Sequence, residues 1–252
     1  MARHSAAQLP GLDAGAGFRL VRWVFRRRRL GLPDTPFDGT DVSTGIHRLE
    51  TMDQVGRDGE PGLGDDGLRQ AVRRHVAEAR TVERHFGGAA PEWKAIVDRL
   101  EELAEGLLPD PEWLVDTFLL ANAEVARVVQ TSMRGTRPNT PLGLVNSVRN
   151  AAWYLVLLHG ATTEPVLERR LEELTVDDLN TATVVEALAY LGSSAIDGRI
   201  RALLRGARFR TTSDGPEPAP QRDIEEAERD FQRYVDLVTE KHRLAKAARK
   251  PA

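Results

Sequence analysis

The sequence predicts an all-α protein, and three observations support this fold class. After residue 66, apolar residues recur every three to four positions through most of the chain, which is the period of an amphipathic helix. We find no segment with the apolar–polar alternation, over about four to eight residues, of a half-buried strand. Proline, acidic and glycine residues stand where the helices are expected to begin and end.

The first two helices of this region have clear limits. One runs from Asp66 to Phe86 and carries an apolar stripe, and Gly87 provides the stop. The next begins at Pro91, and its apolar stripe continues to Leu107. Both stripes predict helices with one face in a core.

Later helices are marked by their first residues. Asp110-Pro111-Glu112 is a helix N-terminus, because proline fits the first helical position and acidic groups favour the positive end of the helix dipole. Further helices are expected in chain order over residues 110–133, 140–159, 164–174, 176–191, 195–209 and 222–249.

Composition excludes several classes of protein. The 252 residues include no cysteine, so disulfides, thiol nucleophiles and cysteine metal sites are excluded. The longest apolar run, 151–158, is far shorter than the ~20 residues of a membrane span. The basic N-terminal segment lacks the order of charges and the cleavage site of a secretory signal. We therefore expect a cytoplasmic protein that is able to touch membranes but does not cross them.

The segment 18–30 has the most distinctive pattern in the chain. Four arginines fall on one face of a helix and apolar residues fall on the opposite face. Such a helix suits an acidic protein surface, an anionic membrane or a nucleic-acid backbone, or it packs on its own chain. The residues expected to bind a partner are Phe18, Arg19, Arg22, Trp23, Phe25, Arg26 and Arg29.

Charge alternates in blocks along the chain. Residues 1–33 carry a net charge of +6, and the glycine-rich residues 34–67 carry −7. Residues 69–89 follow at +3 and residues 90–130 at −6. Blocks of this kind suit neighbouring helices of opposite sign or a partner of complementary charge, and the alternative is a set of solvated helix faces.

Five regions follow from these patterns. They are a flexible basic amphipathic N-terminal segment at 1–33, an acidic glycine-rich linker at 34–67, a helical core domain at 68–210, a proline-rich linker at 211–221, and a separate C-terminal amphipathic helix at 222–252. Linkers of this composition and length are typical of domain boundaries.

Two stretches of the core have the same plan. Each is an Ala/Leu-rich helix that ends in glycine, followed by a short turn and a second amphipathic helix, and the two glycines, Gly160 and Gly192, are 32 residues apart. Residues 150–204 thereby resemble a HEAT-like α-helical repeat. The resemblance implies a short array of stacked helix pairs with an extended binding surface. A general helical bundle is the alternative architecture.

Candidate chemical groups do not form a recognisable site. His47 and Glu50, and likewise His75 and Glu78, are spaced as H-x-x-E, whereas helical di-iron sites use the reverse order. Ser193 follows a helix-ending glycine and is expected to cap a helix. No phosphate-binding loop or nucleophile elbow occurs. We therefore predict no catalytic residue, no metal, no cofactor and no small-molecule substrate.

The sequence thus predicts a non-enzymatic helical protein–protein interaction protein, an adaptor or structural subunit of a larger assembly. The alternative is a peripheral membrane-surface or nucleic-acid-binding factor that acts through the Arg-rich N-terminal helix. A third hypothesis is a helical enzyme whose site the sequence does not reveal.

Overall fold

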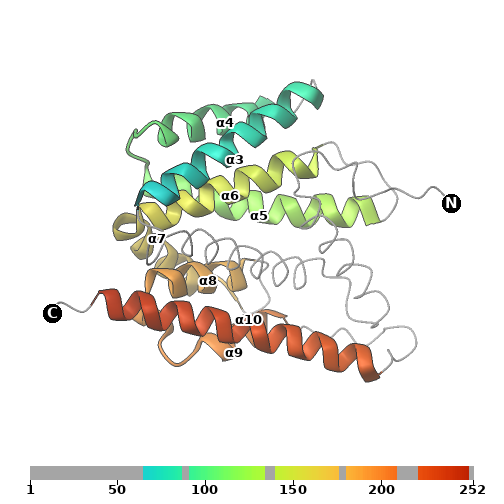
Figure 1. The fold of residues 1–252 in the computed structure, drawn as a ribbon, viewed down its shortest axis with the longest axis vertical. Helices are drawn as coiled ribbons and strands as arrows, with labels where there is room; N and C mark the ends of the chain where they lie inside the picture. Colours follow the sequence, from blue (N-terminus) through green and yellow to red (C-terminus); the bar gives the residue numbers. More distant parts are fainter. Residues whose placement is uncertain (1–64, 87–90, 134–139, 176–179, 209–220, 250–252) are drawn as a thin grey trace. The chain divides into compact units, whose positions relative to one another are not determined.

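The all-α prediction is confirmed. The computed structural model describes residues 65–86, 91–133, 140–175, 180–208 and 221–249. These residues form eight α-helices, labelled α3 to α10, and a short 3₁₀ helix, η2, and they contain no strand (Figure 1). None of these helices is long and apolar enough to span a bilayer. The contacts divide the chain into two compact units, with the division between Val166 and Leu167.

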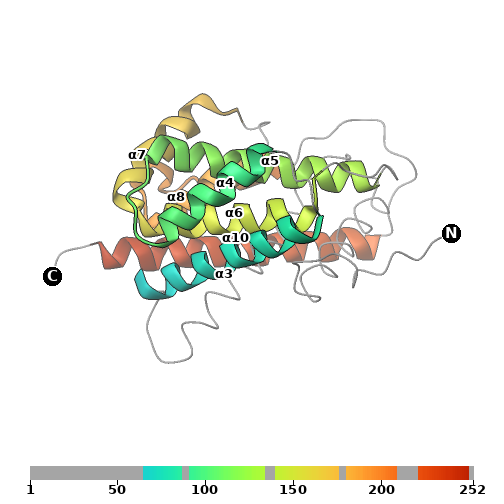
Figure 2. The same ribbon diagram turned by 90° about the horizontal axis from the view of Figure 1, so that it is seen from above.

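The first unit is built around helix α6. Its helices are α3 (Asp65–Phe86), α4 (Pro91–Ala104), α5 (Pro111–Met133) and α6 (Leu142–Leu158). Helix α6 packs against the other three, and it lies between α3 and α5 (Figures 1 and 2). The stretch from Ala151 to Val156 is buried at every position. A helix that is apolar around its whole circumference has to be covered on several sides, and α6 is the helix of this unit that meets this condition.

The contact between α3 and α6 follows a regular seam. Helix α3 buries residues at alternating spacings of four and three, namely Leu68, Val72, His75, Ala79 and Val82. This is the spacing of a coiled-coil seam, in which two helices stay in contact over their length. On the other side of α6, the Trp153 ring lies 5.5 Å from the Phe118 ring of α5.

Helix α4 ends earlier than the apolar stripe predicted. The sequence extends it to Leu107, but the helix stops at Ala104. Gly106 has a φ of 105°, and the amide of Leu107 donates to the carbonyl of Glu102 at 3.2 Å. This is a Schellman turn, which caps the last carbonyl groups of the helix. As a result Leu107 leaves the stripe, and it is 49% exposed while Leu108 is 79% exposed.

Helix α5 begins where the sequence predicts. The carboxylate of Asp110 accepts a hydrogen bond from the amide of Glu112 at 2.9 Å. This satisfies one of the amides that lack an intrahelical partner at a helix start.

The second unit is built around helix α8. Its described part begins within α7 (Gly160–Glu173), at Leu167. Its further elements are α8 (Thr181–Leu191), η2 (Ser194–Ile196), α9 (Ile200–Arg208) and α10 (Gln221–Ala248). Helix α8 packs against α9 and α10, and α9 and α10 also touch each other.

Three predicted helix starts differ from the structure. The helix predicted from 176 begins, as α8, only at Thr181, with Asn180 as its N-cap. Helix α7 begins at Gly160 and not at 164, because the carbonyl of His159 accepts hydrogen bonds from the amides of Thr162 and Thr163. The helix predicted at 195–209 is interrupted at Gly198, whose φ is 67°, so η2 comes first and α9 starts only at Ile200.

The two glycines of the repeat-like stretches have different roles. Gly192 ends α8 in the left-handed conformation with a φ of 71°, whereas Gly160 is the first residue of α7. The order of helices and turns in the two stretches is compatible with a helical array. The turns themselves are not equivalent.

The C-terminal helix packs within the second unit. The sequence treats it as separate, but α10 buries a stripe of Phe231, Tyr234, Val235 and Val238 against its neighbours. A helix with such a stripe is stabilised chiefly by covering it. Residues 1–64 and 209–220 lie outside the described residues, so the N-terminal segment and the linkers stay predictions.

Candidate functional site

The predicted partner-binding segment lies outside the described residues. This applies to all seven side chains, Phe18, Arg19, Arg22, Trp23, Phe25, Arg26 and Arg29. Their role therefore stays a prediction. The described residues contain several other clusters and surfaces that bear on function.

The first is a polar cluster within the α3–α6 seam. His75 Nδ1 lies 2.7 Å from a carboxylate oxygen of Glu78, and the hydroxyl of Ser147 donates to the same oxygen at 3.4 Å. The His75 ring stacks on Tyr154 with 5.7 Å between ring centroids. This H-x-x-E pair thus joins α3 to α6, and no group of three or more potential metal ligands occurs among the described residues.

We expect the Glu78 carboxylate to make this seam sensitive to acid. Burial alone would raise the pKa of Glu78, but hydrogen bonds from His75 and Ser147 and the charges of His75 and Arg74 lower it below 4.5. A carboxylate with a lowered pKa stabilises the fold above its unfolded pKa, and this contribution is lost as the pH falls through the folded pKa.

The wild-type free energy of unfolding should therefore fall more steeply below about pH 4.5 than that of Glu78→Gln, whose amide does not titrate in this range. Urea unfolding at a series of pH values measures both curves. Parallel curves would contradict the assignment.

The second cluster lies where α8 turns into α9. The hydroxyl of Ser193 accepts a hydrogen bond from the amide of Ala195 at 3.1 Å, which confirms the predicted capping role. The same hydroxyl donates to Glu168 at 2.6 Å. His242 of α10 lies 3.0 Å from the Ser193 carbonyl oxygen, and Ser193 itself is fully buried. Since His242 contacts the carbonyl and not the hydroxyl, these groups do not form a nucleophile–base pair.

An ion pair extends this junction to the surface. Lys246 of α10 bonds the carboxylate of Asp197, and His242 Nε2 lies 3.5 Å from the same carboxylate. The hydrogen bond from Lys246 is the main cause that lowers the pKa of Asp197. Together these contacts fix α10 to the turn before α9.

A buried acid–phenol pair joins α8 to α10. The hydroxyl of Tyr234 donates to a carboxylate oxygen of Glu186 at 3.1 Å, and the two residues are 2% and 1% exposed. The sequence pattern did not predict this pair. The available signal is that Glu186 interrupts an apolar run, between Val185 and Ala187, on a helix that is otherwise buried.

The third feature is an ionic network between α3 and α4. Arg80 of α3 bonds Asp98 and, at 2.6 Å, Glu101 of α4, and it also bonds Glu83 of its own helix at 3.0 Å. Burial would lower the pKa of Arg80, but the hydrogen bonds to these carboxylates raise it. Oppositely charged groups of α3 and α4 therefore face each other. This agrees with the explanation of the charge blocks as neighbouring helices of opposite sign.

The fourth feature is the connection between α4 and α5. We call Leu107 and Leu108 the leucine corner. Acidic residues flank it on both sides in the chain, and no basic residue occurs between Arg99 and Arg127. The side chains of Glu102 and Glu105 are 58% and 72% exposed, and they form ion pairs with Arg99 at 2.6 Å and with Arg73 at 3.8 Å. The corner is therefore an exposed apolar surface in an acidic region.

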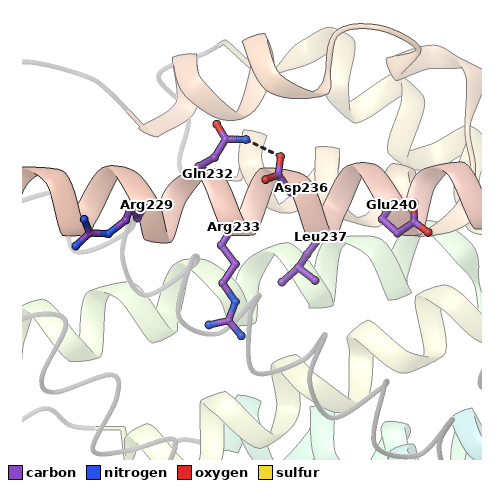
Figure 3. Close-up of a pocket in the computed structure, with 6 residues that line it drawn as sticks. All are labelled: Arg229, Gln232, Arg233, Asp236, Leu237 and Glu240. Carbon is purple, nitrogen blue, oxygen red and sulfur yellow. Dashed lines mark hydrogen bonds between the residues drawn. The ribbon is translucent and has the colours of Figure 1, made fainter.

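A shallow hollow of about 450 Å³ lies along α10 (Figure 3). The described residues that line it are Arg229, Gln232, Arg233, Asp236, Leu237 and Glu240. All six belong to one helix. Polar groups from several elements do not converge among them in the way that an enzyme pocket requires.

Comparison of the chain with family models, with characterised proteins and with solved structures gives no match. The fold itself defines the structural class of the protein. It is an all-α protein with two compact helical units, each built around a central apolar helix.

Proposed function

We propose that this chain is a non-enzymatic helical interaction protein, an adaptor or structural subunit of a larger assembly. The observation that carries this proposal is the leucine corner. Elsewhere in the described residues, large apolar side chains are mostly buried in the two cores, whereas Leu107 and Leu108 are held in the open by a capped helix end.

The surroundings of the corner indicate the chemistry of a partner. Covering a leucine side chain contributes about 1.5–3 kcal/mol, so two adjacent leucines suffice to anchor a small interface. The acidic residues around them favour a basic partner, because complementary charge speeds association and excludes acidic competitors. The partner we propose is a protein segment that presents apolar residues among arginines or lysines.

The contacts of the polar clusters support the proposal that the protein is not an enzyme. Ser193, His242 and His75 are residue types that catalyse reactions, yet each is engaged in contacts that join helices. We place the protein in the cytoplasm, which agrees with its cysteine-free sequence.

The alternative is binding to an anionic membrane surface or to nucleic acid through residues 18–30. It is supported by the sequence pattern of that segment, in which arginines are interleaved with aromatic and aliphatic residues.

HEAT-like architecture also remains a proposal. It is supported by the order of helices and turns over residues 150–204, and the unequal roles of Gly160 and Gly192 weigh against a regular repeat.

We expect the leucine corner to hold the partner in the native cell. The full-length chain carrying an affinity tag is compared with the double variant Leu107→Ser/Leu108→Ser, and the bound proteins are identified and quantified. Loss of two buried leucines should weaken binding by about a hundredfold or more. A stoichiometric partner should therefore disappear from the double variant, and its binding to the unchanged chain should weaken as salt rises.

Leu120→Ser is the matched control, because Leu120 is 54% exposed but lies on α5, outside the corner. A partner retained by the double variant would refute the proposed site. If instead lipid or nucleic acid is recovered, and is lost when Arg22, Arg26 and Arg29 are changed to glutamine together, the alternative function replaces the proposed one.

A further inference from the structure

The apolar seam of α4 runs past the residue where the helix ends. Its buried side chains alternate at spacings of four and three residues, and they are Trp93, Val97, Leu100 and Ala104. Leu107 follows Ala104 by three residues and is therefore the next position of the seam. Its side chain is nevertheless about half exposed, because the backbone turns away at Gly106. The pattern of this helix and the position of its end are thus in conflict.

Gly106 is the residue that decides between the turn and a longer helix. Residues 101–105 are Glu-Glu-Leu-Ala-Glu, which are all good helix formers, and the leucine at 107 is another. Glycine is a poor helix former, and it adopts the φ of 105° that this turn requires. Gly106 therefore favours the short helix, while the residues on either side of it favour a longer one.

Pro109 limits how far α4 can extend. The residue before a proline is disfavoured in the helical conformation, so Leu108 stays outside the helix in either arrangement. A longer α4 therefore ends at Leu107, and residues 108–110 still suffice to connect it to α5. The capping bond at the start of α5 involves only Asp110 and Glu112, so it does not oppose the extension.

Helix α3 lies beside the end of α4. Arg80 pairs with Glu101 and Arg73 pairs with Glu105, so the two helices run antiparallel. Helix α3 begins at Asp65, about 12 Å of helix before Arg73. The residues that a longer α4 adds after Glu105 would therefore still have α3 as a neighbour.

We propose that the end of α4 is a two-state switch. In the short state, which the structure shows, α4 ends at Ala104 and the leucine corner is exposed. In the long state α4 continues to Leu107, which takes the next position of the seam, and Leu108 alone stays exposed. A partner at the corner binds the short state and shifts the equilibrium toward it. This coupling rests on the function proposed for the corner, whereas the switch itself does not.

Gly106→Ala tests the switch on the chain alone, with Gly198→Ala as the matched control. Both glycines have a positive φ, and no atom lies within 4 Å of a Cβ added to either. Alanine disfavours the turn and favours a helix, so Gly106→Ala should raise the ratio of long to short state by about thirtyfold or more. The extension relieves the strain at this site. At Gly198 the contacts of Asp197 with α10 hold the turn, so the strain remains there.

Urea unfolding of the two variants gives the first readout. Gly106→Ala should lower the unfolding midpoint less than Gly198→Ala does, because only the first variant has a second state in which the strain is absent. An equal or larger loss would show that the chain keeps the short helix end and bears the strain, and this result would overturn the proposal.

Thiol labelling gives a second readout, because the chain has no cysteine of its own. Leu107→Cys and Leu108→Cys are each labelled in the otherwise unchanged chain and together with Gly106→Ala. Labelling at position 107 should slow by about fivefold or more, since the long state covers this position, whereas labelling at position 108 should change by less than about twofold. Unchanged labelling at 107, or equal slowing at both positions, contradicts the switch.

The coupling to a partner is measured separately. For a protein bound at the leucine corner, Gly106→Ala should weaken binding by about the factor by which it slows labelling at position 107. Slowed labelling with unchanged binding would refute the coupling. A chain that binds no partner at the corner would contradict the function proposed for it, but both readouts of the switch would stand, so the two failures are distinguishable.

Discussion

Gly192→Ala is expected to lower the free energy of unfolding by about 3 kcal/mol or more. The φ of 71° costs an alanine about 1–2 kcal/mol. In addition, its Cβ would lie 2.8 Å from the backbone nitrogen of Lys246 and 2.9 Å from the carbonyl carbon of Ala245, both in α10. Backbone atoms of a packed helix do not move as a side chain does, so α10 would have to shift away from α8. Urea unfolding followed by circular dichroism measures the loss.

Gly198→Ala is the matched control for this substitution. Its φ is 67°, but no atom lies within 4 Å of the added Cβ. It should therefore show the conformational cost alone, about 1–2 kcal/mol. The difference between the two variants reports the contact with α10, and equal losses would show that α10 does not approach this turn in solution.

Trp153→Ala is expected to cost about 3–5 kcal/mol of the stability of the protein. Trp153 is fully buried at the centre of the first unit, and its ring lies 5.5 Å from that of Phe118. Its removal leaves a cavity between α5 and α6 that rigid neighbouring helices fill only in part. Urea unfolding measures the cost, and hydrogen exchange should show faster exchange in α5 and α6.

Leu120→Ala provides the comparison on α5. Its side chain is 54% exposed, so the substitution should change stability by less than about 0.5 kcal/mol. A loss for Trp153→Ala no larger than that for Leu120→Ala would show that α6 is not the central helix of a packed unit.

The ends of the helices show how far sequence reasoning reaches. Asp110 identifies the start of α5 correctly, because the capping bond involves only residues close together in the chain. The end of α4 is predicted too late, although Gly106 is visible in the sequence. The apolar stripe continues through Leu107, and the choice between extending the helix and forming a Schellman turn depends on whether that leucine has a surface to cover.

The candidate sites likewise contain some contacts that the sequence predicts and others that it does not. Sequence reasoning assigns Ser193 its capping role, since the cap and its amide are two residues apart. It does not bring His242 to the Ser193 carbonyl or Tyr234 to Glu186, because each of these pairs is separated by nearly fifty residues. The exposure of the leucine corner is likewise a result of packing and not of spacing.

The sequence by itself determined that the protein is all-α and where most of its helices lie, because apolar periodicity, caps and stops act within a few residues. Only the tertiary structure decided that the helices divide into two units, that α6 and α8 are their central helices, and that α10 is fixed to the α8–α9 turn through Gly192, Ser193 and His242. An apolar stripe shows that a helix is covered but does not name the helix that covers it. That choice depends on the shape of the contacting surfaces and on bonds between distant residues, which a linear pattern does not contain.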